Sequence, residues 1–365
     1  MSFGEKQLQG ARNLLFRCIG ASGGESLLLV EEPETYDRFD PAVADCIAQQ
    51  ALHLGMSVSR CTPDLISDPV DFPVSVLSQM SDADHTVFLS RLGDYCRFTA
   101  LDATCSKTIC YIDTLEALGS DFGNLCHRLF NSMLERFEQE LLSKKRWHIE
   151  CPLGTDIQGE FNWPTRDQEV ASDFTMNLFP VTTFIPVPCE SAQGRVALSR
   201  WLVPGSAPKV EPSHLSLDSR VFAEVEDGEI THFSGAPEMV RQVNAHYDHI
   251  SSTLGVNRRR VHSWHAGLNP FTSFSGDLSS LEDWKRWESI SFASPRYLHF
   301  HTCGDVPPCE IAWSLFNPSV RIDGELYWHN GQFLWYRRPD NRSLLDQHTG
   351  GNALLRKSAD IGVGM

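Results

Sequence analysis

The sequence predicts a two-part fold of the α/β plus β class: an N-terminal α/β domain with a mainly parallel sheet, then a β-rich domain that carries the functional site. In the first 150 residues, short apolar runs alternate with helix-length amphipathic segments. From about residue 151, short β-type runs are separated by turn pairs. A chain of 365 residues, 41% of them hydrophobic, is longer than one domain usually is. We therefore expect domains at 1–150 and 151–338, followed by a tail at 339–365.

The N-terminal part has the pattern of βα units. The apolar run from Ser26 to Val30 is typical of a short buried strand. Asp40 as N-cap and Pro41 at the first helical position predict a helix that ends at Gly55. Further strands are expected at 56–60, 85–90 and 107–112, and one apolar stripe predicts a long helix: Leu125, Leu129, Met133, Phe137 and Leu141. Strands that alternate with helices predict a parallel sheet, and no glycine-rich phosphate loop joins strand to helix.

The C-terminal part has the turn chemistry of hairpins. The pairs at 227–228 (Asp-Gly), 323–324 (Asp-Gly) and 330–331 (Asn-Gly) favour tight turns between antiparallel strands. One helix is expected at about 237–254, where apolar residues recur on one face. The polar tail at 339–365 has no clear period, so we expect it to be partly disordered or to pack on a partner subunit.

Composition limits the class of partner. The formal net charge is −16 without a basic stripe, which argues against nucleic acid and anionic membranes and favours a small-molecule substrate. The eleven cysteines are an odd number, and the first ten residues lack an apolar signal core. No apolar run approaches the roughly 20 residues of a membrane span. We expect reduced thiols, a cytoplasmic location and no membrane segment.

Five potential metal ligands gather between residues 260 and 312: His262, His265, His299, His301 and Glu310. Neutral imidazoles with a carboxylate suit Zn²⁺ or Fe²⁺. Because side chains alternate along a strand, His299 and His301 share a face, and Ser263 shares one with His265 while His262 points the other way. A bulge near Gly267 would invert that choice. The predicted ligands are His265, one of His299 and His301, and Glu310.

Two other chemistries receive less support from the sequence. Cys303 and Cys309 could bind a soft metal, although free cysteines are usually buried hydrophobic residues. Serine hydrolysis is disfavoured because the chain has no GxSxG elbow. The adjacency of His262 and Ser263 is not expected to place the imidazole beside its neighbour's hydroxyl.

Several short motifs, in order along most of the chain, resemble those of one family. They are Gly154-Thr155-Asp156, Phe179-Pro180, the run from Pro188 to Gly194, Glu226-Asp227-Gly228, Gly267-Leu268-Asn269-Pro270 and Pro308-Cys309. Together they are similar to the aminopeptidase T-like metallopeptidases and their relative 2,5-dihydroxypyridine 5,6-dioxygenase, a ring-cleaving non-haem iron enzyme. The resemblance implies an N-terminal α/β domain, a β-rich metal domain and a homo-oligomer. It also implies two metals in the peptidases, and one Fe²⁺ held by two His and one Asp in the dioxygenase.

The family's ligands do not all carry over. Its His-x-Asp pair falls on Glu310 and Ala312, and its bridging Glu falls near Thr183. A ligand ahead of the Gly-x-Asn-Pro turn aligns nearest Ser263. The resemblance therefore implies a rearranged mononuclear site, with Glu310 joined by His265 and by His301 or His299.

Three functions follow as hypotheses. The first is a mononuclear non-haem Fe²⁺ oxygenase acting on a small aromatic or heteroaromatic metabolite, with His265, His301 and Glu310 on the metal. In it, His299 or His262 moves a proton, and four aromatic residues are candidates for the substrate wall: Trp264, Trp313, Tyr327 and Trp328. The second is a Zn²⁺-dependent aminopeptidase or amidase. The third is a metal-free divergent member of the family that serves a biosynthetic pathway.

Overall fold

The computed structural model describes residues 2–66, 69–97, 99–163, 176–181, 183–205, 210–278, 281–306 and 309–363. Contacts divide the chain into two compact units, 1–133 with 171–182, and 134–170 with 183–365. The division lies earlier than the expected boundary at residue 150, because the strand at Arg146–Glu150 pairs within the second sheet. Pro308, one of the family markers, lies outside the described residues.

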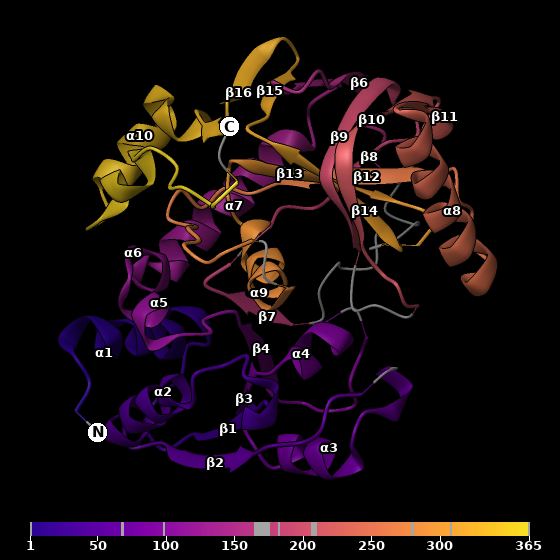
Figure 1. Cartoon of the computed structure of the whole chain (residues 1–365). Helices are drawn as coiled ribbons and strands as arrows, with labels where there is room; N and C mark the ends of the chain where they lie inside the picture. Colours follow the sequence, from indigo (N-terminus) through magenta and orange to yellow (C-terminus); the bar gives the residue numbers. More distant parts are fainter. Residues whose placement is uncertain are drawn as a thin grey trace. The chain divides into compact units, whose positions relative to one another are not determined.

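The first unit contains the parallel sheet that the sequence predicts (Figure 1). Its strand order is β2-β1-β3-β4-β7, and every pair is parallel. The strands are β1 Ser26–Glu31, β2 Ser57–Cys61, β3 His85–Leu89, β4 Ser106–Cys110 and β7 Asn177–Phe179. Four residues of β1 are buried, as an apolar run between layers requires.

Short helices precede and connect these strands. They are α1 Glu5–Arg12, α2 Pro41–His53, α3 Val74–Ser81, α4 Arg91–Cys96, α5 Leu115–Gly119 and α6 Asp121–Asn124. Helix α2 begins where expected, because the Asp40 carboxylate accepts a hydrogen bond from the amide of Ala42. It packs on β1 and β2, while α4 packs on β3 and β4. Helix α7 (His127–Leu141) carries the predicted apolar stripe, including the buried Phe137.

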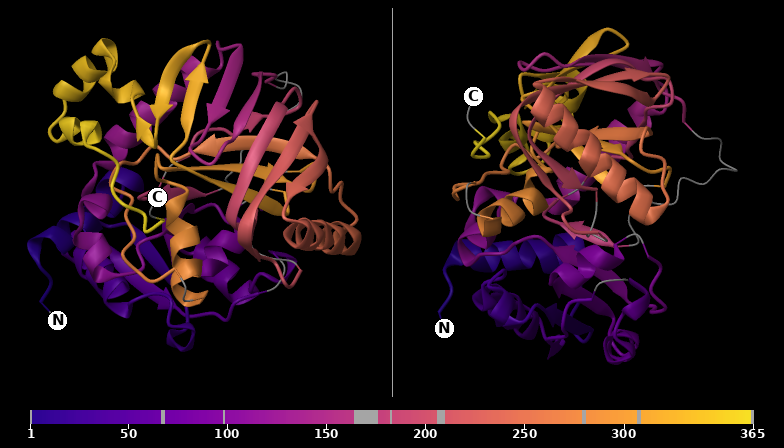
Figure 2. Two further views of the ribbon diagram at one scale, coloured as in Figure 1. Left: turned by 45° about the horizontal axis from the view of Figure 1, so that its top comes forward. Right: turned by 45° about the vertical axis from the view of Figure 1, so that its right-hand side comes forward.

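The second unit is built on a large, curled antiparallel sheet (Figure 2). The main strand order is β17-β16-β15-β5-β6-β9-β14-β13-β12-β8, with β10 beside β9 and β11 beside β10. The strands are β5 Arg146–Glu150, β6 Asp156–Glu160, β8 Val187–Pro188, β9 Gln193–Pro204, β10 Leu215–Glu226, β11 Glu229–Gly235, β12 Val261–Ala266, β13 Tyr297–Thr302, β14 Ile311–Phe316, β15 Ser319–Ile322, β16 Glu325–His329 and β17 Gln332–Phe333.

The predicted turn pairs join neighbouring strands of this sheet. Asp227, Asp323 and Asn330 all have positive φ and are each followed by a glycine with positive φ, as a type I′ turn requires. They connect β10 to β11, β15 to β16 and β16 to β17. Helix α8 (Pro237–Leu254) packs against β10 and β11, and its bounds match the prediction.

The C-terminal segment is folded as far as Val363, the last residue that the structure describes, which corrects the expectation of partial disorder. It contains α10 (Pro339–Asp346) and a short 3₁₀ helix at Gly351–Leu355. Ile361 and Val363 are buried in a cluster with Trp287 of α9 (Leu281–Ser291), Tyr297 and Phe316. A few well-spaced apolar residues thus anchor a tail whose average composition is polar. None of the described helices is both long and apolar enough to cross a membrane.

Candidate metal centre

The candidate site is set by the pairing of β12 with β13. His265 pairs with His299, and Ser263 pairs with His301. Directly paired residues of antiparallel strands place their side chains on the same face of the sheet. The expected alternation is therefore confirmed for Ser263, His265, His299 and His301, which share one face.

A register shift occurs between Val261 and Ser263. Val261 pairs with Thr302 and Ser263 pairs with His301, so two steps along β12 correspond to one step along β13. His262 is the extra residue of a β-bulge, a feature that redirects a side chain. The bulge lies at His262, not near Gly267, and the predicted choice of His265 over His262 is retained.

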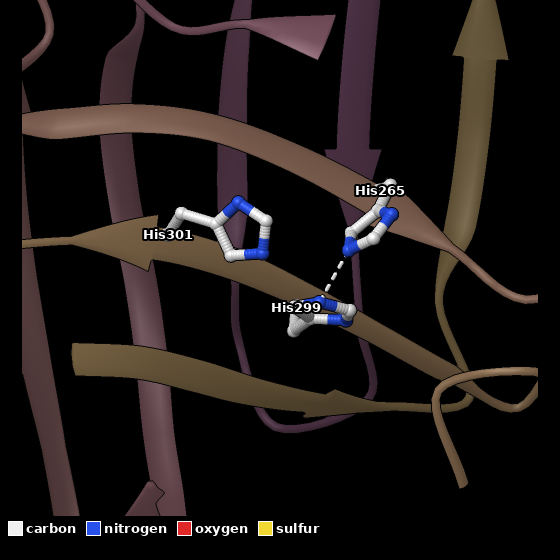
Figure 3. Close-up of side chains that lie close together, drawn as sticks. All are labelled: His265, His299 and His301. Atoms are coloured by element: carbon white, nitrogen blue, oxygen red, sulfur yellow. Dashed lines mark hydrogen bonds between the residues drawn. The ribbon is translucent and has the colours of Figure 1, made fainter. Parts of the chain in front are cut away.

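Three imidazoles converge on this face (Figure 3). His265, His299 and His301 each offer one ring nitrogen, and these donor atoms all lie within 4.8 Å of one another. The ring centroids are 3.9 Å apart for His265 and His299, and 4.9 Å apart for each pair with His301. The exposed fractions of the three residues are 5%, 8% and 5%, so the group is shielded from bulk water.

The chemistry of this donor set fits a divalent cation. Nε2 of His265 lies against Nε2 of His299, and a hydrogen bond between them requires that one nitrogen carry a proton and the other not. A cation removes that requirement, because it accepts lone pairs from both rings. Three imidazoles are also a donor set of catalytic zinc sites and leave coordination positions open. Within the described residues, this is the group of three or more potential ligands that could hold a metal ion.

Glu310 does not belong to this group. Its amide donates to the carbonyl oxygens of Thr302 and Cys303, one residue before β14 begins. In β14 it is Ala312 that pairs with His301, so a methyl group stands where the family motif has a carboxylate. Burial, followed by the negative charge of Glu310, raises the pKa of the Cys303 thiol to about 12. Its assignment as a ligand stays a prediction, and the geometry favours His299 in its place.

The other candidate ligands have different surroundings. Burial also raises the pKa of the Cys309 thiol, and neither Cys303 nor Cys309 belongs to the group of potential ligands among the described residues. His262 is half-buried, and burial followed by the charge of Arg260 lowers its pKa. Thr183, near which the family's bridging Glu falls, supplies a hydroxyl and no carboxylate.

One expectation about His262 is wrong. Its Nδ1 lies 3.0 Å from the Ser263 hydroxyl, although the adjacency of the two residues was not expected to allow this. The bulge is the reason, because it turns a side chain that regular alternation would place on the opposite face. The same hydroxyl lies 3.2 Å from Nδ1 of His301.

The aromatic residues around the site differ from those expected. Tyr297 stacks on His299 with ring centroids 5.4 Å apart, and Phe184 meets His265 edge-on at 6.2 Å. Trp264 and Trp313 each pair with Phe300 and so project from the opposite face of the sheet. Tyr327 and Trp328 lie on β16, where both rings pack on Phe137. The alternation Tyr297, His299, His301 was visible in the sequence and could have identified Tyr297.

Helix α9 covers the neighbouring part of this face. Trp284 packs with Val203 and Ala312, and Ala312 lies opposite His301. Trp287 donates a hydrogen bond to the carbonyl oxygen of Ile361, which ties the C-terminal segment to the helix. The three imidazoles are thus bordered by large apolar rings.

Comparisons with known proteins agree with this fold. No protein-family model matches the chain, and no curated protein matches it in sequence. Among solved structures, it is similar to 2,5-dihydroxypyridine dioxygenase from Pseudomonas putida KT2440, with a TM-score of 0.60 and 14% identity over 93% of this chain and 100% of that chain. It is also similar to AmpT from Thermus thermophilus, with a TM-score of 0.51 and 11% identity over 90% and 99% of the two chains. The resemblance inferred from the motifs is confirmed at the level of the fold.

Proposed function

We propose that this protein is a mononuclear, non-haem iron-dependent oxygenase that acts on a small aromatic or heteroaromatic metabolite. The observation that carries the proposal is the convergence of His265, His299 and His301 on a buried face bordered by aromatic rings. When bound there, Fe²⁺ supplies the one-electron chemistry that O₂ requires. The ligand set differs from the sequence-derived one, because His299 holds the metal and does not serve as a mobile proton carrier.

The residues of the chain have separate roles in this proposal. The three imidazoles bring no negative charge, so a bound divalent cation keeps its full charge and attracts an anionic oxygen of the substrate. Tyr297 and Phe184 exclude water and fix the rings of His299 and His265. Ala312 presents only a methyl group opposite His301, and Trp284 packs against it. These features favour a planar, oxygen-bearing substrate.

A second candidate is a Zn²⁺-dependent aminopeptidase or amidase, and the donor set itself favours it. Three histidines with an open position hold zinc in hydrolytic sites and lower the pKa of a bound water to about 7. Peptide hydrolysis also needs a general base near the metal, and Glu310 is outside the donor group. Because no carboxylate belongs to the donor group, the hydrolase is the weaker candidate.

Metal analysis of the protein purified without chelator tests the ligand assignment. We expect about one metal ion per chain, and less than about a tenth of that in His265→Ala, His299→Ala and His301→Ala, because each removes one of three ligands. Glu310→Gln keeps the shape of the side chain without its charge and should retain the metal. If His299→Ala kept its metal and Glu310→Gln lost it, the ligands would be His265, His301 and Glu310, as predicted from the sequence. That result would contradict the assignment of His299 as a ligand.

Activity assays then separate the candidate functions. Iron at about one per chain, with O₂ uptake in the presence of hydroxylated aromatic or heteroaromatic rings, is the expected result. Zinc with cleavage of aminoacyl amides would favour the hydrolase. Wild-type protein that binds neither Fe²⁺ nor Zn²⁺ would contradict both and leave the metal-free alternative.

A further inference from the structure

Ser263 lies between two imidazoles, only one of which belongs to the candidate metal group. Its hydroxyl oxygen is 3.2 Å from Nδ1 of His301 and 3.0 Å from Nδ1 of His262. The side chain is 1% exposed, so water does not compete for these contacts. Ser263 is held in place on both sides, since it pairs with His301 of β13 and with Pro188 of β8.

The number of available protons limits the protonation states of His262, Ser263 and His301. A serine hydroxyl carries one proton and two lone pairs, so Ser263 can donate to only one Nδ1, and at least one of the two rings must present an Nδ1–H to it. Where Ser263 donates to one ring and accepts from the other, two neutral histidines are opposite tautomers at Nδ1. If Ser263 donates to His262, then His301 carries its proton on Nδ1 and its Nε2 is the unprotonated nitrogen that bears a lone pair. The reverse direction places the proton on Nε2 of His301 and blocks that atom as a ligand.

The orientation of the His301 ring favours the first direction. Figure 3 shows one of its nitrogens facing His265 and His299. Because Nδ1 contacts Ser263, the nitrogen that faces the other imidazoles is Nε2. A lone pair at this position is what a cation shared by the three rings requires.

We infer that Ser263 is a positioning residue that holds His301 as the Nδ1–H tautomer, with His262 as the acceptor that fixes the direction of the Ser263 hydroxyl. This inference rests on the proposed function, because a bound cation is what requires a lone pair on Nε2 of His301. The bulge at His262 then has a functional reason, since it places a second imidazole against the hydroxyl of its own neighbour. Hydrogen bonds of this kind typically raise metal affinity by about 10- to 100-fold.

The tautomer is tested by long-range ¹H–¹⁵N NMR of the full chain labelled with ¹⁵N-histidine, in metal-free protein at neutral to alkaline pH. His301 is assigned from the signal that disappears in His301→Gln. We expect an Nδ1–H signature for His301 and an Nε2–H signature for His262. An Nε2–H tautomer for His301 in the wild-type protein would overturn the inference, and this result needs no variant of Ser263 to fold.

Zn²⁺ titration against a chromophoric chelator tests the consequence for metal binding. We expect Ser263→Ala to bind Zn²⁺ about 10- to 100-fold more weakly than the wild type. A matched pair at His262 separates a hydrogen-bond role from simple packing. His262→Asn keeps an acceptor close to the position of Nδ1 and should retain affinity, whereas His262→Phe fills the space without an acceptor and should lose it.

The outcomes distinguish this inference from the proposed function. Equal Zn²⁺ affinity in Ser263→Ala, His262→Phe and the wild type would overturn the positioning role. A wild-type protein that has the Nδ1–H tautomer at His301 but binds neither Zn²⁺ nor Fe²⁺ would overturn the proposed function and support the tautomer assignment.

Discussion

Burial, more than neighbouring charge, lowers the pKa of individual histidines of this chain. His246 of α8 is 6% exposed, and its Nε2 has no hydrogen-bond partner among the residues that the structure describes. Burial, followed by the charges of His249 and His214, lowers the pKa of His246 to about 4. The imidazole is therefore neutral at pH 7, and its protonation opposes folding.

The pH dependence of stability follows from the difference between the pKa of His246 in the folded chain and in the unfolded chain. The unfolded chain has an ordinary His246, with a pKa near 6.5, so between about pH 6.5 and 4 the unfolded state binds more protons. The free energy of unfolding must then fall as the pH is lowered through this window, by up to about 3 kcal/mol from this residue. Above about pH 6.5 the contribution is constant.

We predict that His246→Phe removes this part of the pH dependence. Urea unfolding at pH 7.5 and pH 5 measures it, and the loss of stability between the two should be smaller in the variant than in the wild type by about 1–2 kcal/mol. His53→Asn is the matched control, because His53 is exposed at the end of α2. Identical losses in His246→Phe and the wild type would contradict a buried neutral imidazole at this position.

The positions of some site residues could be predicted from the alternation of side chains along a strand, whereas others could not. The common face of His265, His299 and His301 follows from strand periodicity alone. The contact of His262 with Ser263 depends on a bulge, which is a property of the pairing register between strands distant in sequence. Glu310 was selected from motif spacing, yet its place in space depends on where β14 begins. The metal ligands could therefore be assigned only once the pairing register of β12, β13 and β14 was known.

At the scale of elements, the parts with strong local signals were predicted well. The Asp-Gly and Asn-Gly turns have the backbone conformation that these residue pairs favour, and α8 starts at a proline and ends before Gly255 with positive φ. The two-residue strands β8 and β17 were not foreseen. Strands so short carry no periodic pattern, and their pairing partners alone define them.

Gly267 connects β12 to the turn that follows it. A Cβ atom on this residue would overlap the backbone carbonyl of Ala293 and the amide nitrogen of Ser294. The Gly267 amide donates to the carbonyl of Tyr297, and its carbonyl accepts from the indole of Trp328. The end of β12, two residues from His265, is thus held against backbone on one side and an indole on the other.

We predict that Gly267→Ala lowers the free energy of unfolding by about 1–3 kcal/mol, because backbone atoms cannot move aside as a flexible side chain can. It should also weaken Zn²⁺ binding, since any shift of β12 moves His265. Urea unfolding and Zn²⁺ titration measure the two effects. Gly4→Ala is the control, because there a Cβ meets only the Gln7 side chain at 3.3 Å; as Gly4 is the N-cap of α1, stability should fall by no more than about 1 kcal/mol, with no effect on Zn²⁺ binding. Equal stability of the two variants would contradict the argument.

At the scale of the whole molecule, the candidate metal ligands are confined to one of the two units. The parallel sheet of the first unit contains none of the three imidazoles, and all three belong to two adjacent strands of the second unit. The class of each sheet was predictable because parallel and antiparallel sheets differ in local pattern. The folding of the C-terminal segment was not predictable from local pattern. It depends on the packing of Ile361 and Val363 against Trp287 and Tyr297.

This separation predicts where a bound metal changes local stability. His265 lies on β12, and His299 and His301 lie on β13, so any opening that parts these strands also disperses the ligands. A metal at about 1,000 times its Kd adds about 4 kcal/mol to the cost of such an opening. Amide exchange in β12 and β13 should therefore slow by at least about tenfold when Zn²⁺ is added to chelator-treated protein. Exchange in β1 and β3 should not change.

Hydrogen–deuterium exchange read by mass spectrometry measures both regions in one sample, so the first unit serves as an internal reference. His301→Ala supplies the matched control, because it keeps the β12–β13 ladder and removes one of the three donors. In that variant, Zn²⁺ should leave the exchange of both strands unchanged. Slower exchange in β1 and β3 without a change in β12 and β13 would place the binding site in the parallel sheet. Since that sheet has none of the three imidazoles, such a result would exclude the candidate centre as the site of the metal.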